Sequence, residues 1–266
     1  ARTNDTAMIV VIKGLSDASI FAIATYVSAI MEIPQRSLNA ISIPVLAKSW
    51  KDKDFANIKH VYHKSVSNLL AIGLLLFGLI WLNIENLVAF LNWVSNKEGG
   101  GYEALAPIVF IMGLAKLIDL ATGVNGQIIG TSNYWRFDFF TNLFYIVLSI
   151  PLNFYLISNY SLIGLAYSNL AALTLYNSVR FLFLYKKFKL QPYTLQHGLF
   201  LILSIALMFL IYIIPSTSNF VMNIAIKSSI YGLGFYGLII WINPAPELKE
   251  LVQGFLKNKL FGFLRR

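Results

Sequence analysis

The chain has 266 residues, of which 57% are hydrophobic and only 12% are charged, and its mean hydropathy is +0.66. A soluble domain carries roughly a quarter charged residues, so this composition excludes an ordinary soluble domain and indicates a membrane protein. The net charge is +9, and there is no cysteine, which excludes disulfides and thiolate metal sites.

Apolar stretches long enough to cross a bilayer recur along the whole chain. A spanning helix needs about 20 mostly apolar residues, and this pattern predicts an all-α polytopic membrane protein. A shorter apolar stretch, 6–13, is interpreted as the end of one more span, so we expect the chain to be part of a longer protein. The predicted spans are 18–47, 62–91, 104–130, 137–158, 161–185, 195–214 and 219–242.

Basic residues are concentrated in alternate loops. They occur around 48–64, at 136, at 186–189 and in the tail at 249–266, whereas the intervening loops contribute only Lys97. Cytoplasmic loops are the ones rich in Lys and Arg, so the C-terminus is predicted to be cytoplasmic. The basic charge is therefore explained by topology, and no nucleic-acid partner is expected.

The tail 244–266 has apolar residues on one helical face and charged residues on the other. This pattern predicts an amphipathic helix that lies on the anionic lipids of the inner leaflet. A helix that docks on a partner protein is the alternative interpretation.

The span 18–47 is too long for a straight crossing and contains Pro34 and Pro44, which predict a break. Glu32 and Arg36 flank Pro34 at the i,i+4 spacing that favours an ion pair, and Asn39 follows about one turn later. The pair either neutralises itself and locks the kink, or belongs to a transport cavity in which Arg36 binds an anionic headgroup.

The span 104–130 is predicted to be one long helix with Lys116 and Asp119 near its centre. Each such charge costs about 2.5–3.5 kcal/mol at the middle of a bilayer, and the two are spaced to pair at i,i+3. Two ion pairs at this depth favour a polar cargo path over packing alone. Asn125 and Gln127 follow in the same span, either as contacts between helices or as cargo-binding groups.

Signatures of enzymes are absent from the sequence. There is no Walker motif, no G-x-S-x-G elbow and no H-E-x-x-H motif. His60 and His63 have no further ligands nearby in the sequence, and a solvated helix face explains them. We therefore expect a transporter without catalytic residues, metal or cofactor.

Three segments together resemble a known family. They are EIPQRSLNAISIPVLA at 32–47, KLIDLATGVNGQIIGTSNYWRFDFFTN at 116–142 and PLNFYLISNYSLIGLAYSN at 151–169. They are similar to polysaccharide-biosynthesis (O-antigen-type) flippases of the multidrug/oligosaccharidyl-lipid/polysaccharide exporter superfamily. The third segment departs from that pattern, because Ser158 replaces a proline and Ser168-Asn169 replaces Ala-Thr.

The resemblance implies a MATE-like helical bundle in a bacterial inner membrane. Residues 1–188 would form the second six-helix lobe with its first helix truncated, 189–243 two additional helices, and 244–266 the cytoplasmic tail. The first lobe would precede this segment in the same chain.

The resemblance also implies an activity, which is to move a polyprenyl-pyrophosphate-linked oligosaccharide from the inner to the outer leaflet for cell-surface polysaccharide and lipopolysaccharide synthesis. A coupling ion, H+ or Na+, would drive the transport. The implied substrate-binding residues are Arg36 and Lys116, which would receive the pyrophosphate, with Asn39, Asn125 and Gln127, while Glu32 and Asp119 would balance charge or bind the coupling ion.

Two other functions remain open. A MATE-type multidrug or cation antiporter of the same fold would require net acid in its cavity, whereas the charges here are mixed. An integral-membrane glycosyltransferase or acyltransferase would require a long loop with clustered carboxylates or histidines.

Overall fold

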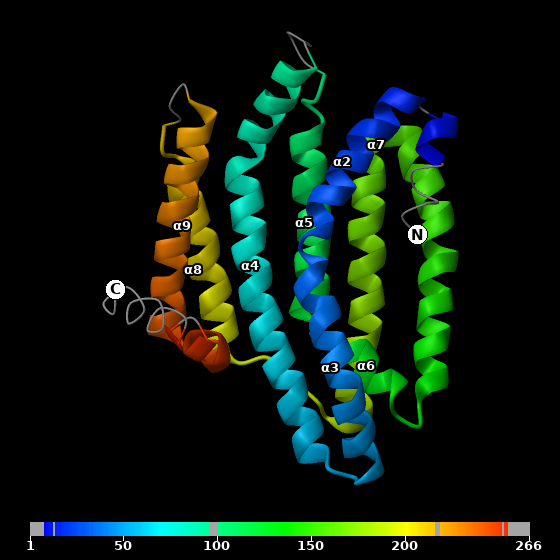
Figure 1. Ribbon diagram of the computed structural model, residues 1–266. Coiled ribbons are helices and arrows are strands. Elements are labelled where there is room, and N and C mark those ends of the chain that lie inside the picture. The colour runs from blue at the N-terminus through cyan, green and yellow to red at the C-terminus, as the bar shows by residue number, and fades with distance from the viewer. Residues whose placement is uncertain (1–7, 13, 96–100, 216–218, 252, 255–266) are drawn as a thin grey trace.

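The computed structural model describes residues 8–12, 14–95, 101–215, 219–251 and 253–254. These residues form helices and turns and no strand, which confirms the all-α prediction (Figure 1). Residues 8–12 are helical, and the rest of the predicted stretch 6–13 lies outside the described residues. The helices labelled in Figure 1 are α2 (Leu15–Ala29), α3 (Glu32–Lys51), α4 (Phe55–Val94), α5 (Leu105–Ala121), α6 (Asn125–Gly130), α7 (Trp135–Phe188), α8 (Leu195–Tyr212) and α9 (Phe220–Ile242).

Four of these helices are long and apolar enough to cross a membrane, namely α4, α7, α8 and α9. The number rises to five if α2 and α3, which are bent by 48° relative to each other, count as one broken span. The length and composition of these helices indicate a membrane-embedded helical protein.

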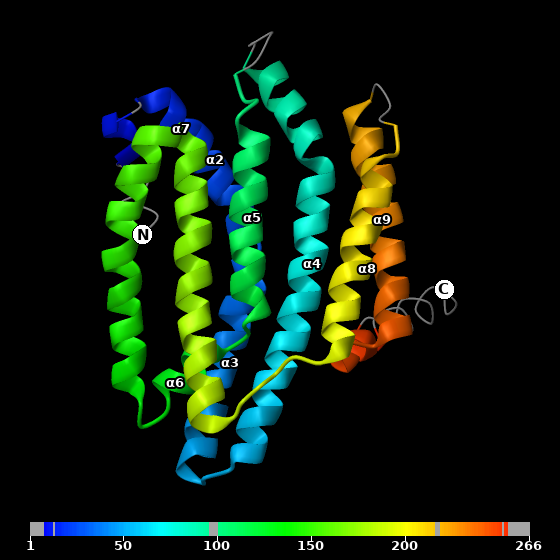
Figure 2. The same cartoon turned by 180° about the vertical axis from the view of Figure 1, so that it is seen from behind.

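Helix α7 contains two of the predicted spans. Its 54 residues reverse direction at Ser161, whose backbone leaves the helical region at φ 56° and ψ −147°. The two arms lie side by side (Figure 2). The predicted division between 158 and 161 is therefore confirmed.

The break between α2 and α3 lies where proline predicts it. Pro34 has no N–H to donate to the carbonyl of Ile30, which instead accepts from the N–H of Ile33 at 3.3 Å. Pro44, in contrast, lies inside α3 without ending it. The bend lies beside α5, between the two ends of the bundle (Figure 1).

The prediction of one continuous helix over 104–130 is wrong. Helix α5 ends at Ala121, and a turn precedes the short helix α6. Gly123 makes this turn possible with φ +63°, and a Cβ on it would lie 2.5 Å from the hydroxyl of Ser65 in α4. The same Ser65 hydroxyl accepts the N–H of Val124 at 3.2 Å, so α4 stabilises the break.

The basic connections lie together at one end of the bundle. They are the α3–α4 and α6–α7 turns, the α7–α8 linker and the described residues 243–251 after α9 (Figures 1 and 2). The opposite end carries the C-terminal ends of α4 and α8, the N-terminal ends of α5 and α9, and the reversal of α7. This arrangement agrees with the predicted separation of basic and non-basic loops.

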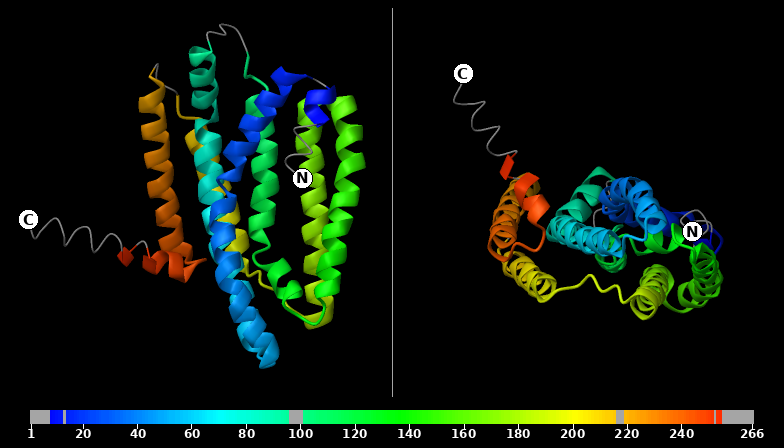
Figure 3. Two further views of the ribbon diagram at one scale, coloured as in Figure 1. Left: turned by 45° about the vertical axis from the view of Figure 1, so that its right-hand side comes forward. Right: turned by 90° about the horizontal axis from the view of Figure 1, so that it is seen from below.

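Helices α8 and α9 pack together against α4, on the side away from α7 (Figure 3). Phe200 of α8 and Phe235 of α9 belong to the same buried cluster as Leu74 and Phe77 of α4. The hydroxyl of Tyr231 in α9 donates to the carbonyl of Leu74 at 2.9 Å. Most of the predicted amphipathic tail lies outside the described residues.

The chain after α9 is tied to α4 through Glu247. Its carboxylate pairs with Lys64 and accepts from Asn68 Nδ2 at 2.9 Å. Burial raises the pKa of the Glu247 carboxyl, but the hydrogen bonds from Lys64 and Asn68 outweigh it and hold the pKa below its usual value. The carboxylate is therefore charged at neutral pH.

The role of Gly123 predicts the effect of adding one methyl group. Gly123→Ala forces a side chain into a positive-φ position against Ser65 and should destabilise the protein by about 1–3 kcal/mol. Gly198→Ala is the matched control, because Gly198 lies in α8 with no atom within 4 Å of an added Cβ. That substitution should be neutral or slightly stabilising in thermal unfolding, and an equal effect of both would contradict the assignment of the break to Gly123.

Candidate functional site

Three of the four predicted charged residues meet at the carboxylate of Glu32, in the first turn of α3. Its Oε2 accepts from Arg36 Nη2 at 2.9 Å, and its Oε1 pairs with Lys116 Nζ of α5 at 2.6 Å. The side chains of Glu32 and Lys116 are only 14% and 19% exposed. The predicted Glu32–Arg36 pair therefore forms, and Lys116 joins it from another helix.

Asp119 is held differently from the sequence expectation. Lys116 pairs across the bundle with Glu32, and Asp119 instead accepts from two amides, Gln35 Nε2 at 3.1 Å and Asn177 Nδ2 at 2.9 Å. Within the described part of the chain, no basic side chain lies at ion-pair distance from Asp119. The direct partners of this carboxylate in the described residues are therefore amide dipoles.

Asn177 in the second arm of α7 links Asp119 to the α5–α6 turn. Its Oδ1 accepts from Thr122 Oγ1 and from Asn125 Nδ2, both at 3.0 Å. Asn125 is buried, and its side-chain amide connects α6 to α7 through the hydrogen bond to Asn177. Asn125 was one of the predicted cargo-binding residues, and its contacts match the alternative interpretation of an interhelical bond.

Arg36 is the exposed member of the cluster. Its side chain is 69% exposed, although it lies near the centre of the α2–α3 pair, which runs from Leu15 to Lys51. Ile33 and Ile41 of α3 are exposed as well. Figures 1 and 3 show α3 on the outer side of the bundle. A guanidinium is thus presented outward, beside the partly buried carboxylate and ammonium.

Asn39 lies one turn after Arg36 and is half-buried. Its Oδ1 is buried without a hydrogen-bond partner among the described residues. The ion pairs of the charged cluster join Glu32, Arg36 and Lys116 and do not include Asn39.

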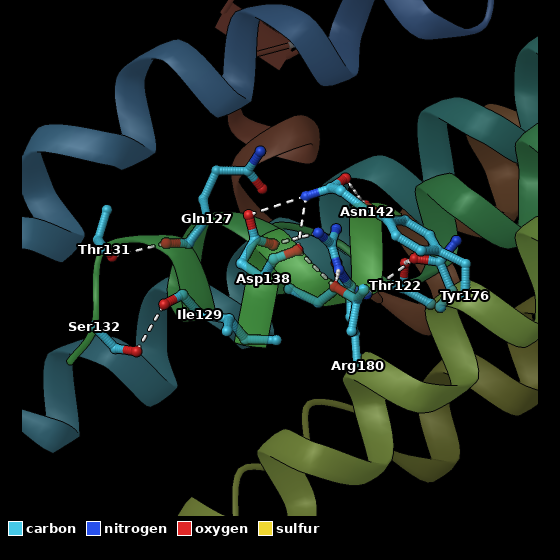
Figure 4. A network of polar contacts seen from close by, with 12 residues as sticks. Thr122, Gln127, Ile129, Thr131, Ser132, Asp138, Asn142, Tyr176 and Arg180 are labelled. Carbon is cyan, nitrogen blue, oxygen red and sulfur yellow. Dashed lines mark hydrogen bonds and ion pairs between the residues drawn. The ribbon is translucent and has the colours of Figure 1, made fainter. Parts of the chain in front are cut away.

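Gln127 lies in a separate polar pocket between α6 and α7, with a volume of about 410 Å³ (Figure 4). At the centre of this pocket Arg180 pairs with Asp138, and the Arg180 side chain is only 8% exposed. The guanidinium carbon of Arg180 lies 4.0 Å from the ring centroid of Tyr176, a cation–π contact. The pocket is lined by Ile43, Gly126, Gln127, Gly130, Thr131, Asp138, Asn142, Tyr176 and Arg180.

Sequence reasoning missed this pocket, although the sequence carries a signal for it. Asp138 and Arg180 are equidistant from Asn159, and so are Asn142 and Tyr176, whose side chains share a 2.8 Å hydrogen bond. Two antiparallel arms that reverse near residue 159 must bring such residues together. The predicted break at 158–161 could therefore have indicated which residues of the two arms lie opposite each other.

Metal binding finds no support in the described residues, where no group of three histidine or acidic side chains is placed to hold an ion. Comparison of the chain with known protein families, curated proteins and solved structures found no match. The resemblance of the sequence to polysaccharide flippases thus stays a prediction.

The central ion pair predicts a measurable coupling between α3 and α5. In a double-mutant cycle with Glu32→Gln and Lys116→Met, each single variant strands a partner in a poorly hydrated site, and the coupling energy should be about 0.5–3 kcal/mol. The measurement is thermal unfolding in one detergent.

The control cycle uses Lys64→Met and Glu247→Gln, whose side chains are 46% and 38% exposed. Water screens this pair, so its coupling should stay below about 1 kcal/mol. A coupling between Glu32 and Lys116 no larger than that of the control would show that their ion pair does not hold the helices together.

Proposed function

We propose that the chain is the second lobe of a membrane transporter that flips a polyprenyl-pyrophosphate-linked oligosaccharide from the inner to the outer leaflet. The observation that carries this proposal is the exposed guanidinium of Arg36 near the centre of the α2–α3 span. A charged group at this depth is costly against lipid, so a polar path beside α3 is the favourable surrounding.

The exposed surface of α7 shows the contrast. Its first arm presents a continuous apolar face without a charged residue from 139 to 160, as a lipid-facing helix does. The α3 face interrupts its exposed isoleucines with Arg36. The exposed apolar residues of the α7 arm are Phe139, Phe140, Leu143, Phe144, Ile146, Val147, Ile150 and Phe154.

The arrangement of charges favours an anionic cargo. Glu32 alone faces two bases, Arg36 and Lys116, so this part of the cluster has one surplus positive charge. The other acid of the site, Asp119, accepts from the amides of Gln35 and Asn177 and forms no ion pair with Arg36 or Lys116. An arginine with free donors binds phosphate oxygens in a bidentate manner, which suits a pyrophosphate.

Asp119 is our candidate for the coupling ion. A carboxylate that has only amide partners can take up a proton or a sodium ion without breaking an ion pair. The rest of the path would be supplied by a first lobe facing α3, in a bacterial inner membrane with the basic loops in the cytoplasm.

The Asp119 carboxylate also supports the alternative function of a MATE-type multidrug or cation antiporter. There Asp119, which no base neutralises in the described residues, would attract a cationic drug. The two functions differ in the sign of the cargo, so one experiment separates them.

The test uses the full-length protein in liposomes that contain a fluorescent polyprenyl-pyrophosphate disaccharide. Dithionite quenches the lipid only after it reaches the outer leaflet. Arg36→Gln and Lys116→Gln should each slow flipping about tenfold or more, since each removes a charge-assisted hydrogen bond to phosphate. Normal rates in both variants would contradict the proposal.

Lys186→Gln is the matched control, because Lys186 is exposed at the end of α7 and outside the cluster. It should flip the lipid at the wild-type rate. A protein that leaves the lipid in place but exports a cationic dye, and loses this activity in Asp119→Asn, would support the antiporter instead.

A further inference from the structure

We propose that the polar pocket between α6 and α7 binds a neutral polyhydroxylated group, such as one sugar ring. The pocket lies apart from Glu32 and Lys116 and is lined by α3, α6 and both arms of α7 (Figure 4). Its volume of about 410 Å³ falls in the range of small-molecule sites, roughly 300–1,000 Å³.

The pocket is electrically neutral because its charged side chains neutralise each other. Arg180 pairs with Asp138, donates from Nε to Thr141 Oγ1 at 3.3 Å and stacks on the ring of Tyr176. A phosphate would have to displace Asp138 from this arginine. An uncharged ligand avoids that cost, so the pocket differs in chemistry from the exposed Arg36.

Hydrogen-bonding groups remain available around this neutral centre. The side-chain amide of Gln127 makes no hydrogen bond to the described residues, and in Figure 4 it extends beyond Asp138 without a partner. Among the described residues, Asp138 Oδ2 accepts one hydrogen bond, from Asn142 Nδ2 at 3.2 Å, and the other carboxylate oxygen pairs with Arg180. Amide and carboxylate groups match sugar hydroxyls, because each hydroxyl both donates and accepts.

Gly126 lets the α6 backbone approach Arg180, whereas a Cβ on Gly130 would make an ordinary contact. A Cβ on Gly126 would lie 2.5 Å from Arg180 Nη1, and one on Gly130 would lie 3.6 Å from Asp138 Oδ2. The α6 backbone can therefore approach the ion pair closely enough to place Gln127 at the edge of the pocket.

The position of the pocket also fits the proposed cargo, and this step rests on the proposed function. Ile43 lines the pocket and lies seven residues, or two helical turns, after Arg36 on the same face of α3. The Cα atoms of Arg36 and Ile43 are therefore about 10 Å apart along the axis of α3. A ligand with phosphate at Arg36 and a sugar directly attached to it would span this distance.

The test is saturation-transfer difference NMR of the full-length protein in lipid nanodiscs prepared without glycoside detergents. The probes are the methyl glycosides of glucose, galactose and N-acetylglucosamine. At least one should show a saturation signal, and Gln127→Leu should reduce it about fivefold, the effect of losing a neutral hydrogen bond.

Asn159→Leu is the matched control, since Asn159 is exposed on α7 and bonds only to the carbonyl of Tyr155. It should keep the full signal. The proposal is overturned if no glycoside gives a signal with the wild-type protein, or if Gln127→Leu and Asn159→Leu behave alike.

A second arm separates this site from the proposed flippase activity. In Arg36→Gln, the glycoside signal should persist while binding of inorganic pyrophosphate, followed by phosphorus NMR, falls. A persistent glycoside signal in a protein that does not flip lipid would support the pocket and contradict the transport proposal. Loss of the glycoside signal in Arg36→Gln would overturn the assignment of a separate sugar site.

Discussion

The carboxylate of Glu32 determines how charge is arranged in the interior of this bundle. A base in a poorly hydrated interior requires a counter-charge, which Glu32 supplies to Lys116 of α5 while it also pairs with the exposed Arg36. Its position depends on the helix break, because α3 starts at Glu32 directly after the bend that the missing N–H of Pro34 allows. A backbone irregularity thus places an acid between two bases.

One consequence is an asymmetry between the inner and outer parts of the site. Lys116 is sheltered by its ion pair, and Asp119 is fixed by the amides of Gln35 and Asn177, whereas Arg36 extends outward. Two helical turns along α3, the neutral pocket around Arg180 offers hydrogen bonds in place of charge. A cargo that combines a charged group with a neutral polar group would complement the exposed Arg36 and the neutral pocket, which follow each other along α3.

Sequence patterns predicted what depends on local chemistry. Apolar length and composition identified a helical membrane protein, Pro34 located the α2–α3 break, and the i,i+4 spacing identified the Glu32–Arg36 pair. The end of α5 was missed, because it depends on Gly123 packing against Ser65 of α4. The sequence spacing offered Lys116 only Asp119 as a partner, and this was wrong, because the packing of α3 on α5 brings Glu32 to Lys116 instead. The partner of Lys116 is set by tertiary packing, which leaves no local signal in the sequence.

The most direct test of the account asks whether the face of α3 around Arg36 borders water or lipid. The 266 residues contain no cysteine, and in a cysteine-free background of the full-length protein single cysteines can be placed at Ser37 and Ala40 on α3 and at Phe144 and Val147 on the apolar face of α7. A charged, membrane-impermeant thiosulfonate reagent reacts with thiolates, which require water. The account predicts labelling of both α3 cysteines and no labelling of the α7 cysteines in the full-length protein in membranes. If the α3 cysteines are as unreactive as those of α7, the polar path beside Arg36 does not exist.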